Sequence, residues 1–340
     1  MPRRFFLLLL ALSFFASCTP SLPALPTVTP APANVTRLPG TDTATPFLPG
    51  PFEPSSTPLS SATPEPLPTV TTSPLPLPSV TLTSSATPTV SPTPLPWTLG
   101  LDPAEWKAWP VLPVVPSGMR EVYDLGQSRG NAPHAFSVFG DCQSEPDVFW
   151  GRYDTDPAAV AGLSSGLQET VAWFAGSFER ESPTAQSGMT AGALLWAEWH
   201  RGRYGCSYAE TPVTCELRLH HPSFVFIHVG THYEARNINY LRRVIDQLLA
   251  AGVVPILVTK ADNRERDERV NADYAALAVE YDIPLWNFWL AVDDLPDRGL
   301  YTRANMPLQG SIYLTEEALE IQRLTGLQAL DTVWRAVTGR

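Results

Sequence analysis

Residues 224–237 read FVFIHVGTHYEARN, and this stretch decides the fold. Its almost unbroken apolar run stops at Gly230, and polar residues follow at once. A run without polar alternation is typical of a strand buried on both faces of a parallel sheet. We therefore expect such a strand here, with Thr231, His232 and Tyr233 placed at its carboxyl end.

Strands and helices alternate on both sides of this stretch. Further apolar strands are predicted within 134–141, 253–263 and 283–292, with amphipathic helices between them. Residues 182–199 predict a loop followed by a helix, and Thr315 is expected to cap a final helix. The alternation predicts an α/β fold with a central parallel sheet covered by helices on both sides. In such sheets, functional groups gather beyond the carboxyl ends of the strands.

Residues 1–18 are typical of an export signal. Arg3 and Arg4 precede an apolar stretch that is shorter than the roughly 20 residues needed to span a bilayer. The stretch ends in Ala-Ser before Cys18, which resembles the bacterial lipobox, where the cysteine is acylated. We expect an exported protein that Cys18 anchors to the outer face of the cell membrane. Ordinary cleavage and secretion is the alternative.

Residues 19–100 predict a disordered stalk. The segment holds most of the chain's 36 prolines and almost no charge. Proline removes backbone donors and fixes φ, so neither helix nor sheet propagates there. Tracts rich in Thr, Ser and Pro are extended spacers, and we expect this one to separate the folded domain from its anchor.

Residues 101–340 are long enough for one domain with a sizeable core. The chain carries 23 Lys and Arg against 34 Asp and Glu, a formal charge of −11. An acidic surface without a basic stripe is a poor partner for phosphate backbones, so nucleic-acid binding is not expected.

The sequence gives no reason to expect a cofactor or a metal. It has no phosphate-binding loop, no dinucleotide glycine pattern and no His-Glu-x-x-His helix. His220 and His221 lack acidic or cysteine neighbours at ligand spacing and are expected to be solvated. Cys206 and Cys215 flank a short polar stretch and predict a disulfide, which leaves Cys142 free.

Polar groups at the strand exits resemble the motifs of the SGNH/GDSL hydrolase family. The exits carry Gly140-Asp141-Cys142, then Gly230-Thr231-His232, and then Asp262 in the sequence TKADN. The family consists of esterases and lipases built as three-layer α/β/α sandwiches, so the resemblance implies that fold. It spans most of residues 134–337, in motifs that are short and altered.

The resemblance assigns a role to each altered position. Cys142 stands at the nucleophilic serine, and Cys142, Gly188 and His232 stand at the oxyanion-hole positions. Tyr313 stands where the family has its general base, and Gly310 where it has the orienting aspartate. Asp141, Thr231 and Asp262 would be further cleft residues.

The substituted positions and the long stalk lead to three hypotheses for the function. Acyl transfer needs a nucleophile activated by a base, and a tyrosine with a pKa near ~10 is a poor proton acceptor at neutral pH. The favoured hypothesis is a non-catalytic domain that binds a glycan, an acyl-bearing envelope ligand or no ligand at all. One alternative is an active esterase that uses Cys142 with His232 or Asp262 as base. Another is a stalked display or adhesion module.

Overall fold

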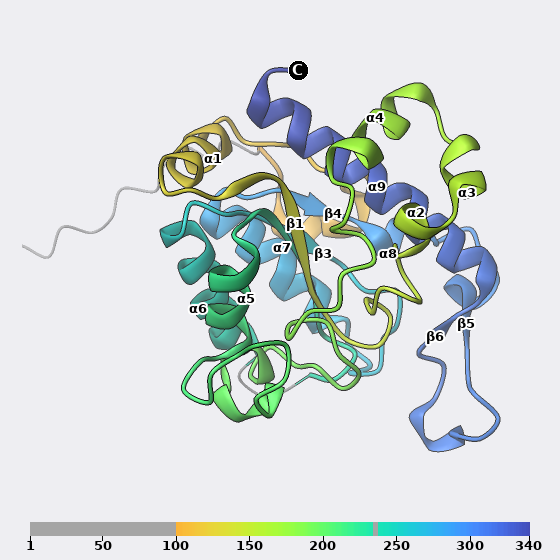
Figure 1. Ribbon diagram of the computed structural model, residues 1–340. Helices are drawn as coiled ribbons and strands as arrows, with labels where there is room; N and C mark the ends of the chain where they lie inside the picture. The colour runs from red at the N-terminus through yellow and green to blue at the C-terminus, as the bar shows by residue number, and fades with distance from the viewer. Residues whose placement is uncertain (1–99, 234–236) are drawn as a thin grey trace, which may run out of the picture. The chain divides into compact units, whose positions relative to one another are not determined.

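The computed structural model describes residues 100–233 and 237–340 (Figure 1). The expected signal peptide, the lipidation residue Cys18 and the stalk up to residue 99 lie outside the described residues. Within the described ranges, no helix is both long enough and apolar enough to cross a membrane.

A parallel four-stranded sheet forms the centre of the domain. Its strands are β1 (Ala132–Gly140), β2 (Pro222–His228), β3 (Val254–Val258) and β4 (Leu285–Trp286), and they lie side by side in sequence order. All residues of β2 and β3 are buried, as their apolar sequences require. The predicted α/β class with a central parallel sheet is confirmed.

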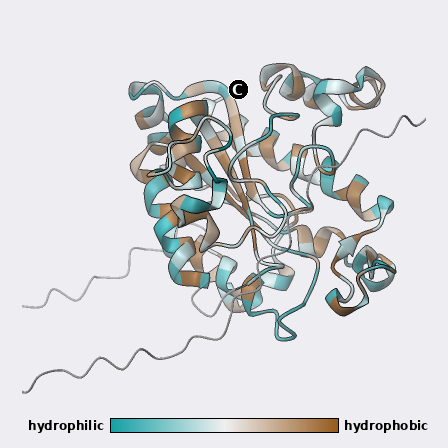
Figure 2. Cartoon of the chain, turned by 60° about the horizontal axis from the view of Figure 1, so that its bottom comes forward, coloured by the Kyte–Doolittle hydropathy of each residue, from teal (hydrophilic) through white to brown (hydrophobic). Residues whose placement is uncertain are grey.

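The strand order explains why α5, α6 and α7 share one face of the sheet. When successive parallel strands are added in one direction, right-handed crossovers place their helices on one face. These helices are α5 (Pro212–His220), α6 (Asn237–Ala250) and α7 (Arg269–Tyr281). The other face is covered by α1 (Gly118–Ser128), α4 (Ser165–Trp173) and α9 (Glu316–Thr338), with α9 packed against α1 and α4. The result is a three-layer sandwich (Figure 1), with hydrophobic strands in its middle (Figure 2).

A rudimentary fifth strand borders β1. The Gly140 N–H donates to the Thr184 carbonyl at 2.9 Å, and the Gln186 N–H donates to the Gly140 carbonyl at 3.1 Å. These bonds form an isolated parallel bridge between Gly140 and Ala185. Because β2 occupies one side of β1, residues 184–186 lie on the other. After β1 the chain pairs first with one side of this strand, through residues 184–186, and then with the other side, through β2. A crevice opens beyond the carboxyl end of a strand at such a change of direction.

Helix α9 approaches the sheet closely through a glycine. A Cβ added to Gly326 would lie 2.7 Å from ring atoms of both Trp150 and Trp286. Trp286 belongs to β4, and both indoles are almost completely buried. Thr315 accepts a hydrogen bond from the Ala318 N–H and begins α9, as the sequence predicts.

Short elements complete the domain. They are η1 (Pro103–Ala108), α2 (Arg152–Thr155), α3 (Pro157–Ala161), η2 (Ala193–Leu195), η3 (Ala197–His200), α8 (Phe288–Ala291), η4 (Pro296–Gly299), β5 (Leu300–Tyr301), η5 (Pro307–Gln309) and β6 (Tyr313–Leu314). Strands β5 and β6 pair antiparallel.

Three local predictions were wrong. Residues 182–199 contain only the 3₁₀ turns η2 and η3, because Gly188 takes a positive φ and glycines weaken helices. The strand expected within 283–292 ends at Trp286, where Asn287 caps α8. His220 is not solvated, since it closes α5 and its Nε2 donates to the Phe136 carbonyl at 3.0 Å.

Candidate functional site

The residues singled out in the sequence lie on segments that meet beyond the carboxyl ends of β1, β2 and β3. The loop after β1 contacts the segment 184–187 through the Gly140 bonds and through a bond from the Ser187 N–H to the Glu145 carboxylate. The Gln143 side-chain amide donates to the Ile312 carbonyl, next to Tyr313. Thr190, Thr231 and His232 line one cavity. The structure thus brings the motif-bearing loops to one rim.

Asp141 is the first residue after β1, and its carboxyl group is buried. One carboxylate oxygen accepts the Gln143 N–H at 3.1 Å. Burial raises the pKa of Asp141 to about 7, and the negative charge of Asp262 raises it further, while the Gln143 N–H, the Thr231 hydroxyl and Lys260 oppose the shift. Asp141 is therefore a carboxyl group that changes its charge near neutral pH.

Cys142 is a half-buried free thiol. Burial raises its pKa to about 12, and the carboxylates of Asp141 and Glu145 add to the rise. Arg303 opposes the shift without reversing it. At neutral pH the group is a thiol, and only the thiolate is an effective nucleophile.

His232 is half-buried beyond β2, and its imidazole is hydrogen-bonded to Arg264. Arg264 Nη1 donates to His232 Nδ1 at 3.2 Å and also contacts the Thr231 carbonyl at 3.3 Å. Burial and the Arg264 charge lower the pKa of His232. The structure has no hydrogen bond between His232 and Cys142, two residues that it describes, so the expected thiol–imidazole pair is not assembled.

Tyr313 does not take the place of a general base. Its hydroxyl donates to the Gln309 side-chain oxygen and lies 3.4 Å from the Met306 sulfur, and the Arg303 guanidinium lies 3.8 Å from its ring centroid. Gly310 has φ 74° and ψ −169°, a conformation that is essentially restricted to glycine. The backbone itself thus disfavours an aspartate at this position.

Gly188 lies in the loop that follows the rudimentary strand. It adopts φ 81°, which favours glycine, and a Cβ added to it would lie 3.9 Å from the Trp199 ring. It is carried on the same segment as Thr190, which borders the His232 cavity.

A buried ion cluster lies under the rim, and the sequence revealed only part of it. Lys260 Nζ contacts Asp262 Oδ1 at 2.9 Å and Glu265 Oε2 at 2.5 Å, and all three side chains are buried. The Thr231 hydroxyl donates to Asp262 Oδ2 at 2.7 Å. The Asp262 carboxylate is therefore engaged by an ion pair with Lys260 and a hydrogen bond from Thr231, and it is not available as a base for Cys142. The sequence TKADN gave the signal, since its lysine and aspartate follow a buried strand.

Ser144 and His228 form a second pair that the sequence analysis missed. The serine Oγ lies 3.1 Å from the imidazole Nδ1, and burial lowers the pKa of His228 to about 4. A serine beside a neutral imidazole is a pair used in acyl transfer. Here Ser144 is 2% exposed, and the cavity beside it holds about 20 Å³, enough for one water molecule and not for an acyl group. His228, which interrupts an apolar strand, was the available signal.

Open cavities lie around the rim. A cavity of about 320 Å³ is lined by Thr231, His232, Tyr233 and Arg264, and it shares Thr190 with a neighbouring cavity of the same volume. A larger cavity of about 850 Å³ is bordered by Glu145 and by residues 185–187. Cys142 lines none of these three cavities. In the described part of the chain, no cluster of His, Cys, Asp or Glu is arranged to hold a metal ion.

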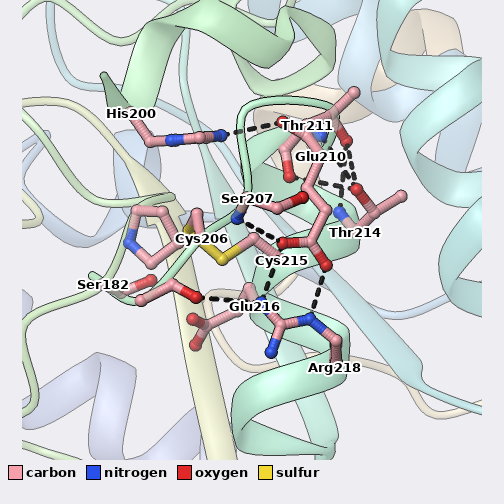
Figure 3. Close-up of a disulfide and its surroundings, with 12 residues drawn as sticks. Ser182, His200, Cys206, Ser207, Glu210, Thr211, Thr214, Cys215, Glu216 and Arg218 are labelled. Atoms are coloured by element: carbon pink, nitrogen blue, oxygen red, sulfur yellow. Dashed lines mark hydrogen bonds and ion pairs between the residues drawn. A yellow bond between two sulfur atoms is a disulfide. The ribbon is translucent and has the colours of Figure 1, made fainter. Parts of the chain in front are cut away.

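The structure contains the expected disulfide between Cys206 and Cys215, whose Cα atoms lie 5.4 Å apart (Figure 3). The bond ties the loop after η3 to helix α5. Figure 3 also shows the Glu210 carboxylate accepting from the Ser207 N–H and from Arg218, each at 2.8 Å. Cys142 remains the free cysteine among the described residues.

Comparison with known proteins gives little beyond this geometry. No family model and no curated protein matches the sequence. Among solved structures, the chain is similar to a GDSL-like lipase from Bacteroides thetaiotaomicron, with 16% identity, a TM-score of 0.39, and coverage of 64% of this chain and 98% of that chain. A superposition this loose establishes neither a shared activity nor shared site residues.

Proposed function

We propose that this chain is a ligand-binding domain with a hydrolase-like α/β/α architecture that lacks acyl-transfer activity. The state of Cys142 carries this proposal. Its thiol pKa is raised to about 12, and its neighbours are carboxylates that oppose ionisation. An enzyme of this chemistry needs a group that takes the proton from its nucleophile.

The candidate bases are engaged elsewhere. His232 accepts a hydrogen bond from Arg264, and Asp262 holds Lys260. The Tyr313 hydroxyl donates its hydrogen bond to the Gln309 side-chain oxygen. The rim nevertheless keeps open cavities beside His232, which is the property that a binding domain requires.

We further propose that the domain is exported and held at the outer face of the membrane through Cys18. The lipobox-like sequence before Cys18 supports anchoring, and the Pro-rich residues 19–100 would supply reach. A disulfide such as Cys206–Cys215 persists outside the reducing cytosol, which supports export.

Hydrolysis of aryl acetates and acetylated sugars by the full-length protein tests the catalytic part. We expect rates equal to those of the Cys142→Ala variant, and slow alkylation of Cys142 by iodoacetamide at neutral pH in a Cys18→Ser background. The denatured protein supplies the control for alkylation, since unfolding removes the burial that suppresses the thiolate. Efficient turnover that disappears in Cys142→Ala would show an active esterase and overturn the proposal.

A further inference from the structure

An aromatic cavity lies next to the His232 cavity. Its lining includes Trp196, Trp199, Tyr240 and Arg243, and its volume is about 320 Å³. The ring centroids of the two tryptophans lie 6.2 Å apart, with their planes at 52°. Trp196 is 53% exposed. The two indoles therefore present an angled aromatic surface at the cavity.

The segment that carries the tryptophans is fixed by buried interactions. His200 follows Trp199 and is fully buried, with Nδ1 accepting the Gly202 N–H at 3.0 Å and Nε2 donating to the Glu210 carbonyl at 2.8 Å. Helix α5 packs against both η2 and η3, and the disulfide ties the following loop to the same helix (Figure 3). A fixed aromatic surface loses little conformational freedom when a ligand binds.

Thr190 lines both cavities, so they lie next to each other, and together they are called the groove here. Each cavity of the groove contains one arginine, Arg243 in the aromatic cavity and Arg264 beside His232.

Two positively charged side chains line this groove in a chain that is acidic as a whole. The chain has a formal charge of −11, and arginines such as Arg180 and Arg335 pair with Glu216 and Glu169. Within residues 100–233 and 237–340, no carboxylate lies within ion-pair distance of Arg243 or Arg264. Two guanidinium groups beside aromatic rings suit a ligand that has both apolar faces and carboxylates.

We propose that this groove binds an oligosaccharide of hexuronic acids, with pyranose rings stacked on Trp196 and Trp199 and carboxylates paired with Arg243 and Arg264. The apolar face of a pyranose ring packs on an indole, and a carboxylate accepts paired bonds from a guanidinium. Each cavity lies at the low end of the range of roughly 300–1,000 Å³ found for ligand pockets, so the joined groove suits a short oligomer. This inference rests on the proposed function and names its ligand class.

Calorimetric titration of the full-length protein with tetragalacturonate tests the inference, with the fully methyl-esterified tetramer as its neutral match. We expect saturable binding of the acid and affinity at least about tenfold lower for the ester, because esterification removes the charges that the arginines bind. Trp196→Ala and Arg243→Gln should each weaken binding of the acid by about tenfold or more. Both side chains reach the surface, and an unchanged thermal unfolding midpoint verifies that the variants fold.

Matched controls lie outside the groove. Tyr208→Ala removes another exposed aromatic ring, and Arg129→Gln removes an exposed arginine at the end of α1, so neither should change the affinity. Equal binding of the acid and the ester, or no binding of either, would overturn the hexuronate inference. Cys142-dependent ester turnover would instead overturn the proposed function, whatever the titration shows.

Discussion

At the scale of single residues, the rim shows how position alone changes the chemistry of a group. Asp141 and Cys142 are adjacent, and burial raises the pKa of each. His232 lies at the same rim, and its pKa is lowered by burial and by Arg264. Each shift favours the neutral form, which leaves His232 able to accept a proton but keeps Cys142 from becoming the thiolate that would act as nucleophile.

Asp141→Asn should make the protein more stable than the wild type above neutral pH. The folded-state pKa of Asp141 is about 7 against an ordinary value of 3.8, so the folded state holds a proton that the unfolded chain releases. The free energy of unfolding of the wild type therefore falls as pH rises from about 4 to about 7. Asparagine keeps an acceptor for the Gln143 N–H and does not ionise, so we expect a gain of roughly 1–3 kcal/mol at pH 8.

Urea unfolding at pH 4, 6 and 8 measures this difference. Asp147→Asn changes an exposed carboxylate close by and serves as the matched control. A variant that is less stable than the wild type at pH 8 would contradict the buried, proton-holding Asp141.

At the scale of elements, close backbone approaches decide how the layers pack. Helix α9 can lie against the sheet because Gly326 leaves room for Trp150 and Trp286. Helix α1 meets the turn before β3 in the same way, since a Cβ on Gly126 would lie 2.1 Å from the Gly252 carbonyl oxygen. Both contacts join segments far apart in the chain, so helix propensity gives no sign of them.

Gly326→Ala should destabilise the domain although alanine is the better helix former. The added methyl would lie 2.7 Å from two large buried rings that have no free space to move into. We expect a loss of about 1–3 kcal/mol in the free energy of unfolding. Gly166→Ala in α4 is the matched control, because its nearest atom would be 3.9 Å away on the Arg335 side chain. It should be neutral or stabilising by up to about 1 kcal/mol. Chemical denaturation of the two variants compares them directly, and equal effects would show that packing is not the cause.

At the scale of the whole molecule, the chain divides by composition. Residues 19–100 are rich in Pro, Thr and Ser, whereas residues from 101 onward have the apolar content of a folded domain. The described residues begin at Gly100, and η1 and α1 are already part of the packed structure. Trp106 of η1 packs edge-on against Trp289 of α8, which ties the start of the domain to its later part.

Brief digestion of the full-length protein with a broad-specificity protease should leave one resistant fragment that begins near Leu101 and ends at Arg340. The backbone of the Pro-rich segment has no sheet or helix to protect it from cleavage, whereas the domain buries its strands. Mass spectrometry of the products identifies the boundary. Protection of the segment 19–100, or cleavage within the domain at the same rate, would contradict this division.

The sequence by itself determined the α/β class, the strands that begin near 134, 223 and 253, and the final helix after Thr315. These follow from local periodicity and from a cap that acts within one turn. It also placed Asp141, Thr231, His232 and Asp262 at strand exits, because a buried apolar run has a visible end.

Only the tertiary structure decided what those residues do. Whether Cys142 ionises depends first on how deeply the packed structure buries it, and whether Asp262 is free depends on Lys260 and Thr231. Ser144 and His228 are 84 positions apart and meet because β1 and β2 pair in register at Gly140. The groove from Trp196 to His232 likewise joins loops that share no local pattern. Such side-chain pairings arise from the packing of distant elements, which local periodicity does not encode.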